Sequence, residues 1–375
     1  MDKKTKIIAT ISDKHCEPEF IRALYEAGMN AARINSAHLT PAGAPTIVEN
    51  VRKVSEQIAI IIDTKGPEIR ITGMAPGFEA GIPVSTGDIV RLRGTSEDLP
   101  SNNELIYLND GHISRDVPAG SVILVDDGEL ELYVREKRGD ELVCEVRNGG
   151  VIYGRKSVNI PGVAIDLPSV TERDARFINW AIDMDVDFIA HSFVRKKEDV
   201  LAVKELIKRR NSSIKIISKI ENKEGVDNID EILDETYGIM VARGDLGVEI
   251  PAERIPGTQR FLVNKCIESK IPVIIATQML HTMISNPRPT RAEISDVANA
   301  IYDGTSAIML SGETAAGLYP VEAVRTMARI AVSAEHDIDY VKRFKMREID
   351  NAHDVTNAIS HATCTTAHDL AASAI

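Results

Sequence analysis

The sequence has few cysteines, no excess of positive charge and no long apolar run, and each absence excludes a class of protein. Its 4 cysteines form no CxxC pair, so the sequence indicates neither a zinc site nor a disulfide framework. Lys and Arg number 44 against 56 Asp and Glu, and the net charge of -12 argues against a nucleic-acid-binding protein. No apolar run approaches the roughly 20 residues of a membrane-spanning helix, so we expect no membrane partner.

The N-terminus shows no sign of a signal peptide, because Met1-Asp2-Lys3-Lys4 leads directly into a strand-like run. We therefore expect a cytoplasmic protein. The chain has 375 residues, of which 43% are hydrophobic and 27% charged, a composition typical of a soluble globular protein with a core. This length favours two or three domains. The acidic balance still permits a small anionic substrate, provided that a local basic pocket receives it.

Eight short runs of β-branched and apolar residues recur along the chain. They are Thr5–Ser12, Ala31–Ser36, Ile58–Gly66, Asp187–Phe193, Ile214–Asn222, Gly238–Asp245, Pro272–Met279 and Ala307–Gly312. Near-continuous apolar runs are typical of strands buried on both faces of a parallel sheet. The segments between them carry helical spacing, most clearly in Glu17–Gly28, Thr171–Asp183, Lys197–Arg210 and Pro320–Glu335. Eight strand–helix repeats predict an α/β fold, a closed (β/α)8 or TIM barrel.

One segment, between Gly66 and Thr171, interrupts this repeat because it lacks helical periodicity. It alternates like a set of strands with turn signals between them, in Asp88–Arg93, Glu104–Asn109, Ser121–Asp126, Glu129–Arg135 and Glu141–Val146. The pattern predicts an all-β domain, residues 67–159, inserted after the third strand of a barrel formed by 1–66 and 160–340. An insertion at that end overhangs the mouth of the barrel, so we expect a lid. A passive insertion is the alternative.

Polar side chains end almost every apolar run, where a barrel of this type carries its catalytic groups. They are Arg33, Asn35, Asp63, Thr64, Ser192, Lys219, Glu221, Arg243, Asp245, Thr277 and Ser311. Lys219 and Glu221 lie inside a run with Ile220 between them, so the mere start of a loop explains them poorly. Residues two apart on a strand point to the same face, which places a cation and a carboxylate together inside the barrel. Because desolvation offsets the Coulomb gain of such a pair, stability alone is a weak reason for it.

Glu221 and Asp245 come from adjacent strands and both offer hard oxygen ligands. Mg²⁺ typically binds one or two carboxylates together with substrate oxygens, so we expect a metal site here. Each acid alone could equally be a salt-bridge partner or a helix cap. Three further cations, Arg33, Arg70 and Lys156, lie near the same rim of the barrel, and on an acidic protein their convergence indicates a phosphate-rich ligand.

Seven stretches of this sequence together resemble the pyruvate kinase family over nearly the whole chain. They are DTKGPEIR (63–70), VNIPG (158–162), ISKIEN (217–222), GIMVARGDLGVEIP (238–251), ATQML (276–280), NPRPTRAEISDVANAIYDG (286–304) and IMLSGETAAGLYPVEAV (308–324). The resemblance implies transfer of a phosphoryl group from phosphoenolpyruvate to ADP, giving pyruvate and ATP. It also implies a C-terminal α/β domain, of which 341–375 resembles the beginning, and a possible homo-oligomer through the barrel.

The resemblance also implies a role for each matching residue. Lys219 would stabilise the transferring phosphoryl group and the enolate, Thr277 would take part in proton delivery, and Arg33 would contact the phosphates. The remaining implied sites are the substrate site (Arg33, Gly244, Asp245, Thr277), the nucleotide site (Asn35, His38, Arg70, Lys156), the Mg²⁺ or Mn²⁺ site (Glu221, Asp245) and the K⁺ site (Asn35, Asp63, Thr64).

This sequence departs from the family pattern at two places. Ala37 replaces the serine that ligates the monovalent cation, which weakens the expected K⁺ site, whereas Glu68 is the residue of potassium-dependent members. Ile11-Ser12-Asp13 replaces an Ile-Gly-Pro motif near the expected adenine position. Two other functions fit the residues: a metal-dependent lyase or aldolase acting on pyruvate-type substrates, and a non-catalytic paralogue that binds a phosphometabolite.

Overall fold

Eight parallel strands form a closed barrel in the computed structural model, which describes residues 3–39, 43–340, 342–343 and 355–372. The strands are β1 (Lys6–Ile11), β2 (Ala31–Asn35), β3 (Ala59–Asp63), β12 (Phe188–His191), β13 (Lys215–Ile220), β14 (Gly238–Ala242), β15 (Val273–Ala276) and β16 (Ala307–Leu310). Their order around the barrel is β1-β16-β15-β14-β13-β12-β3-β2, so β1 and β16 close the sheet. Each strand lies within one of the eight apolar runs, and the predicted (β/α)8 barrel is confirmed.

The pleat of each strand divides its side chains between two cores. Along β13, Ile217 joins the cluster that fills the inside of the barrel, whereas Ile216 and Ile220 pack against the surrounding helices. Successive side chains on a strand point to opposite faces, so Lys219 shares the inward direction of Ile217. The sequence pattern of β13 therefore carries a lysine to the inside of the barrel near its carboxyl end.

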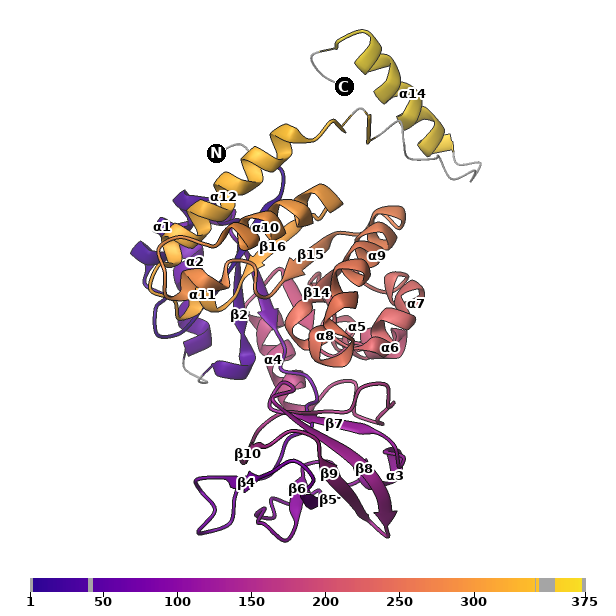
Figure 1. The fold of residues 1–375 in the computed structure, drawn as a ribbon. Coiled ribbons are helices and arrows are strands. Elements are labelled where there is room, and N and C mark those ends of the chain that lie inside the picture. Colours follow the sequence, from indigo (N-terminus) through magenta and orange to yellow (C-terminus); the bar gives the residue numbers. More distant parts are fainter. Residues whose placement is uncertain (1–2, 40–42, 341, 344–354, 373–375) are drawn as a thin grey trace.

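Helices surround the barrel, as Figure 1 shows. They are α1 (Pro18–Ala27), α2 (Gly43–Val54), α4 (Glu172–Asp183), α5 (Lys197–Arg209), α6 (Lys223–Asp227), α7 (Ile229–Leu233), α8 (Arg243–Glu249), α9 (Ile255–Glu268), α10 (Arg291–Asp303), α11 (Gly312–Ala315) and α12 (Pro320–Asp337), with the short 3₁₀ segments η1 (Ser36–His38), η2 (Ala252–Arg254) and η3 (His281–Ile284). The four helices predicted from the sequence are α1, α4, α5 and α12. Thr171 begins α4 with a capping box to Asp174, which explains the position of its N-terminus.

The segment between β3 and β12 forms a separate β structure beyond one end of the barrel (Figure 1). Its elements are β4 (Ile82–Val84), β5 (Ile89–Gly94), β6 (Ile106–Leu108), α3 (Ile113–Asp116), β7 (Val122–Val125), β8 (Leu130–Arg138), β9 (Glu141–Val146), β10 (Gly150–Ile152) and β11 (Val158–Asn159). A six-stranded sheet has the order β11-β7-β8-β9-β5-β6, and β10 pairs with β4. The five predicted strands are β5 to β9. The sequence did not predict β4, β10, β11 or the single-turn helix α3.

The C-terminal helix α14 (Val355–Asp369) lies at the opposite end of the barrel from the inserted sheet (Figure 1). None of its residues is buried, and the Lys270 ammonium group donates a hydrogen bond to the Asn357 side chain at 2.8 Å. The predicted C-terminal segment, 341–375, falls partly on 341, 344–354 and 373–375, which lie outside the described residues. In the described part of the chain, no helix has the length and apolarity required to cross a membrane.

Candidate active site

A cleft of about 770 Å³ lies between the carboxyl ends of the barrel strands and the inserted sheet. Most of the residues singled out from the sequence line it: Arg33, Asn35, Ala37, Asp63, Thr64, Arg70, Lys219, Glu221 and Asp245. These residues are distant in sequence and meet because parallel strands end on the same rim of a barrel. The cleft is therefore the candidate active site.

Lys219 is buried and surrounded by oxygen atoms. Its ammonium group lies 2.8 Å from Oε1 of Glu221 and 3.0 Å from Oδ1 of Asp63, and it donates to Oγ of Ser192 at 2.8 Å. Burial by itself lowers the pKa of Lys219, but the charges of Asp63 and Glu221 outweigh burial and raise the pKa. Lys219 is therefore a fixed cation that keeps its charge although it is buried.

Arg33 is the second buried cation of the cleft, at the end of β2. Its guanidinium group contacts Oδ2 of Asp63 through Nη2 at 2.6 Å and Nε at 2.7 Å, and Nη1 donates to the Thr10 hydroxyl at 3.0 Å. Burial acts to raise the pKa of Asp63, but Arg33 and Lys219 together lower it below the usual range. Asp63 thus stays ionised and holds both cations at fixed positions.

Glu221 and Asp245 place two carboxyl groups beside Lys219. The backbone N–H of Phe193 donates to Oε2 of Glu221 at 2.7 Å. Burial raises the pKa of Glu221, and the charge of Asp245 raises it further. The Asp245 side chain is exposed toward the cleft, yet the surrounding walls desolvate it enough to raise its pKa. In both groups desolvation is the main cause, because burial makes the ionised carboxylate less stable than it would be in water.

A divalent cation fits this donor set. Carboxylate oxygens are the ligands that Mg²⁺ and Mn²⁺ prefer, and Mg²⁺ commonly takes only one or two of them from the protein. Among the described residues, no group of three or more His, Cys, Asp or Glu side chains is arranged to hold a metal. Glu221 and Asp245 would therefore leave coordination positions for oxygens that come from water or a substrate.

Thr277 and Gly244 meet where β14 and β15 end. The backbone N–H of Gly244 donates to Oγ1 of Thr277 at 2.8 Å, and this hydroxyl donates to the carbonyl of Ala276 at 2.6 Å. Gly244 lies in the first turn of α8, next to Asp245. The expected substrate residues Gly244, Asp245 and Thr277 are thus adjacent in the structure, although Thr277 is not among the residues that line the cleft.

The residues expected to hold K⁺ lie together at the ends of β2 and β3. Oδ1 of Asn35 accepts a hydrogen bond from the backbone N–H of Ala37 at 3.1 Å, which caps η1. The Thr64 hydroxyl accepts from the backbone N–H of Ser192 at 3.1 Å. The side-chain oxygens that suit a monovalent cation as ligands belong to Asn35, Asp63 and Thr64. The side chain of His38, an expected nucleotide contact, lies outside the described part of the structure.

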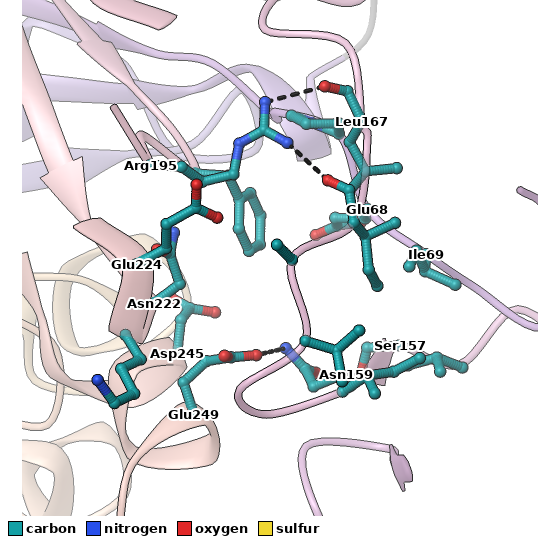
Figure 2. A pocket seen from close by; sticks show the side chains of 18 of the residues that line it. Glu68, Ile69, Ser157, Asn159, Leu167, Arg195, Asn222, Glu224, Asp245 and Glu249 are labelled. Atoms are coloured by element: carbon teal, nitrogen blue, oxygen red, sulfur yellow. Dashed lines mark hydrogen bonds between the residues drawn. The ribbon is translucent and has the colours of Figure 1, made fainter. Parts of the chain in front are cut away.

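Arg70 and Lys156 lie at a second cleft of about 640 Å³. In Figure 2, Asn222, Asp245 and Glu249 of the barrel face Asn159 and neighbouring residues of the inserted sheet across this cleft. Arg70 and Asp245 line both clefts, whereas Lys156 lines only the second and pairs with Asp126 at 2.6 Å. The three expected rim cations therefore do not converge on one cleft in this structure.

Two residues contribute to the site without a role predicted from the sequence. Ser192, which follows β12, accepts from Lys219 and donates to the carbonyl of Thr64 at 2.7 Å. The position of Ser192 at the end of a strand was the sequence signal that could have indicated this role. Arg173, in the first turn of α4, donates to the carbonyl of Ser36 at 2.7 Å and so holds η1 from outside the barrel. No sequence pattern indicates this contact, because it depends on how α4 packs against the end of β2.

Comparisons with known proteins agree with this geometry. The chain matches the family described as "Pyruvate kinase, barrel domain" over residues 2–324. It is 54% identical over 336 residues to a protein of Borreliella burgdorferi named pyruvate kinase, an alignment that covers 89% of this chain and 69% of that protein. It is also 47% identical over 381 residues to a pyruvate kinase of Sporosarcina psychrophila, covering 100% of this chain and 64% of that protein.

A solved structure has the same fold. The crystal structure of a pyruvate kinase from Cryptosporidium parvum superposes with a TM-score of 0.92 at 38% identity, covering 98% of this chain and 77% of that one. The chain thus spans 69% and 64% of the length of the two relatives above. With the barrel, the cleft and these similarities in agreement, the chain belongs to the pyruvate kinase family.

Proposed function

We propose that this chain is a phosphotransferase that catalyses the pyruvate kinase reaction, in which the phosphoryl group of phosphoenolpyruvate passes to ADP to give pyruvate and ATP. The observation that carries the proposal is the buried ammonium group of Lys219, held by Asp63 and Ser192 beside the carboxylate of Glu221. Phosphoryl transfer depends on positioning and charge stabilisation more than on covalent chemistry, and a fixed buried cation supplies both.

Glu221 and Asp245 would hold Mg²⁺ or Mn²⁺, and Asn35, Asp63 and Thr64 would hold K⁺. A bound divalent ion would offset the negative charge that develops on the phosphoryl oxygens. The desolvation that raises the pKa values of Glu221 and Asp245 supports this assignment, because a bound cation would stabilise both carboxylates in their ionised form.

The side chains of this protein would perform four tasks. Lys219 and Arg33 bind the phosphoryl group and keep its charge compensated while it moves between two oxygens. The hydroxyl of Thr277 takes part in delivering a proton to the enolate, with Gly244 fixing the orientation of that hydroxyl. Asn35, His38, Arg70 and Lys156 receive the nucleotide. Asp63 holds the two buried cations and takes no part in proton transfer, because its pKa lies below the usual range.

The inserted β structure, 67–159, would act as a lid over the barrel formed by 1–66 and 160–340, with 341–375 as the start of a further domain. Lys156, which lines the second cleft, would reach the nucleotide phosphates only when the insert moves toward the barrel. A closed lid would also exclude water, which otherwise competes with ADP for the phosphoryl group. A homo-oligomer through the barrel and a cytoplasmic location complete the proposal.

The experiment that tests the function is a coupled assay of pyruvate formation with phosphoenolpyruvate, ADP, Mg²⁺ and K⁺. Turnover that requires ADP supports the proposal. Cleavage of a pyruvate-yielding carbon–carbon bond in the absence of nucleotide would instead identify a lyase or aldolase. Saturable binding of phosphoenolpyruvate without any turnover would identify a non-catalytic binding protein.

A further inference from the structure

Thr277 has a backbone conformation that its side chain disfavours. Its φ is 67°, in the left-handed region, and the next residue, Gln278, has a φ of 54°. For a β-branched residue this region is a genuine outlier, and left-handed backbone costs roughly 1–2 kcal/mol per residue. Such strain persists only where the surrounding structure imposes it, and it concentrates at functional sites. Some group near Thr277 must therefore hold this backbone in place.

The guanidinium group of Arg243 holds the peptide units on both sides of Thr277. Nη2 donates to the carbonyl of Thr277 at 2.8 Å, and Nε donates to the carbonyl of Ala276 at 3.3 Å. Arg243 begins α8, directly after β14, so its side chain crosses from one barrel strand to the end of the next. A planar guanidinium with several donors can fix two carbonyl directions at once, which an ammonium group cannot do.

The far side of the same guanidinium is anchored to the outer helices. Nη1 donates to Oδ1 of Asp296 on α10 at 2.8 Å and to Oε1 of Gln259 on α9 at 3.3 Å. The Arg243 side chain is only 11% exposed. Because both ends of the fork are occupied, Arg243 cannot shift without losing contacts on the other side. Its position is thus fixed between the outer helices α9 and α10 and the end of β15.

Gly244, the residue after Arg243, also contacts Thr277. The backbone N–H of Gly244 donates to the Thr277 hydroxyl, so Arg243 fixes the backbone and Gly244 fixes the hydroxyl. Asp245 follows as the candidate metal ligand. One turn of α8 therefore sets the position of the hydroxyl relative to the carboxylate that lies in the cleft.

We propose that Arg243 is a positioning residue that holds Thr277 in its left-handed conformation and thereby aims the Thr277 hydroxyl for proton transfer. The inference rests on the proposed function for the identity of that proton step. The alternative is that the Arg243–Asp296 pair merely ties α8 to α10. A structural tie would change stability, whereas a positioning residue changes the proton step and acts through Thr277.

Two steps of the proposed reaction can be followed separately. Phosphoryl transfer is measured by the coupled assay. The proton step is measured by exchange of the methyl hydrogens of pyruvate with solvent deuterium, recorded by NMR in the presence of Mg²⁺, K⁺ and inorganic phosphate. The variants are Arg243→Lys, Arg243→Met, Thr277→Ala and each Arg243 change combined with Thr277→Ala. Arg260→Lys is the matched control, because Arg260 pairs with Asp303 at an exposed position on α9.

We expect Arg243→Lys and Arg243→Met to slow exchange about tenfold or more, the effect of losing one or two charge-assisted hydrogen bonds. The KM for phosphoenolpyruvate should change much less. In the double variants, loss of Arg243 should add little to the effect of Thr277→Ala, because the hydroxyl that Arg243 positions is already absent. The inference would be overturned if the Arg243 and Thr277 substitutions slowed exchange independently, so that their effects multiplied in the double variants. It would also be overturned if both Arg243 variants exchanged as fast as Arg260→Lys.

A crystal structure of Arg243→Lys or Arg243→Met tests the inference without any activity. We expect Thr277 to relax to a negative φ in at least the methionine variant. A φ that stays near its original value in both variants would overturn the proposal. Failure of the proposed function gives a different result: the unmodified protein would then show no ADP-dependent turnover, while the Thr277 backbone would still respond to loss of Arg243.

Discussion

Lys219 shows how one residue acquires a function from its surroundings. Three oxygen acceptors within 3.0 Å hold its ammonium group. Burial acts to lower its pKa, but the charges of Asp63 and Glu221 outweigh burial and raise it. Removing the charge while keeping a side chain of similar length should therefore affect charge stabilisation more than packing. The consequences can be separated kinetically, because an interaction made mainly in the transition state appears in kcat.

For Lys219→Met we expect kcat to fall by about 10³-fold or more, on the order of other cations that stabilise a transferring phosphoryl group, with a smaller change in KM. Coupled-assay kinetics measure both constants. Lys215→Met is the matched control, because Lys215 begins the same strand with an exposed side chain. A Lys219→Met enzyme with the kcat of the control would show that Lys219 is only a salt-bridge partner.

Glu221 and Asp245 lead to a prediction about metal. Glu221→Gln and Asp245→Asn keep the size of each side chain but remove the negative charge that a divalent cation requires. We expect each variant to lose most activity and to need more Mg²⁺ for what remains, as measured by Mg²⁺ titration of the rate. Glu268→Gln, at an exposed position on α9, should titrate like the unmodified protein. Full turnover in excess chelator would contradict the metal assignment.

His191 leads to a prediction about pH and stability. It is fully buried on β12, and within the described residues neither of its ring nitrogens has a hydrogen-bond partner. Burial lowers its pKa from 6.5 to about 4. Between these two pH values the unfolded chain binds a proton at His191 that the folded protein does not bind. The contribution of neutral His191 to the free energy of unfolding is therefore fully present above pH 6.5. It falls as the pH drops from 6.5 to about 4, by about 3 kcal/mol at most.

Replacing His191 with leucine should remove this acid sensitivity and, at neutral pH, leave the free energy of unfolding equal or higher, because an unpaired buried polar group disappears. Urea unfolding at a series of pH values between 7.5 and 4 measures the difference. His281→Gln, an exposed position on η3, serves as the control. Parallel stability profiles for the unmodified protein and His191→Leu would contradict the prediction.

At the scale of elements, the short 3₁₀ turn η1 directly follows Asn35, an expected ligand of the monovalent cation, and contains Ala37. Asn35 caps the turn, and Arg173 holds its carbonyl groups. Ala37 lines the cleft but offers no hydroxyl, whereas the hydroxyl of Ser36 is buried and has no partner among the described residues. Glu68 is paired with Lys65 and Arg70. The turn therefore presents one oxygen ligand fewer than the family pattern.

We expect activity to be stimulated by K⁺ but to need more of it than an otherwise equal protein with serine at position 37. Loss of one neutral ligand costs about 1–3 kcal/mol, which corresponds to roughly tenfold weaker binding or more. A K⁺ titration at constant ionic strength, balanced with a bulky inert cation, compares the unmodified protein with Ala37→Ser. The substitution should lower the half-saturating K⁺ concentration. Activity independent of K⁺ in both proteins would contradict the prediction.

The elements that the sequence predicted are those with a strong physical signal. All eight barrel strands were predictable because burial on both faces requires a near-continuous apolar run. Three short strands of the insert, β4, β10 and β11, were not predicted, because they have three residues or fewer and no longer alternating run surrounds them. The equally short β6 was predicted because it lies within the longer run Glu104–Asn109. The helix α3 has four residues and likewise shows no periodicity.

The candidate site likewise has features that the sequence predicted and features that it did not. Strand ends indicated which residues share the mouth of the barrel, because the topology alone brings Lys219, Glu221 and Asp63 together. The sequence could not predict that Asp63 joins Arg33 to Lys219, or that Arg243 grips the backbone of Thr277. Side-chain directions and loop conformations decide these contacts. The separation of Lys156 from Arg33 also depends on the position of the insert, which no local pattern encodes.

At the scale of the whole molecule, the insert and the barrel meet along two clefts joined by a few specific contacts. The amide of Asn159 donates to Oε1 of Glu249 at 3.2 Å, and Arg195 reaches the segment by which the insert returns to the barrel. Figure 2 shows the Arg195 fork directed at this segment. Its two terminal nitrogens donate to the carbonyls of Ile165 and Leu167 at 3.1 and 2.9 Å.

Arg195, which precedes α5, is itself fixed by Asp199 in the first turn of that helix, at 3.0 Å. Burial acts to raise the pKa of Asp199, but its hydrogen bonds with Arg195 and Ser169 lower the pKa overall, so the anchor stays charged. A rigid barrel residue thus holds two backbone carbonyls of the connection. If the insert closes over the barrel as a lid, the segment that connects it to the barrel needs one end that stays in place, and Arg195 would hold that end.

Arg195→Lys should therefore loosen the connection without disturbing the barrel, because an ammonium group cannot reach both carbonyls and Asp199 together. We expect faster backbone hydrogen exchange in 163–167, unchanged exchange in the barrel strands, and a raised KM for ADP with a smaller change in that for phosphoenolpyruvate. Arg209→Lys is the matched control, since Arg209 forms an exposed pair with Glu205 on the same helix. Unchanged exchange in 163–167 would show that Arg195 does not hold the return segment and would contradict its role as an anchor for the proposed lid.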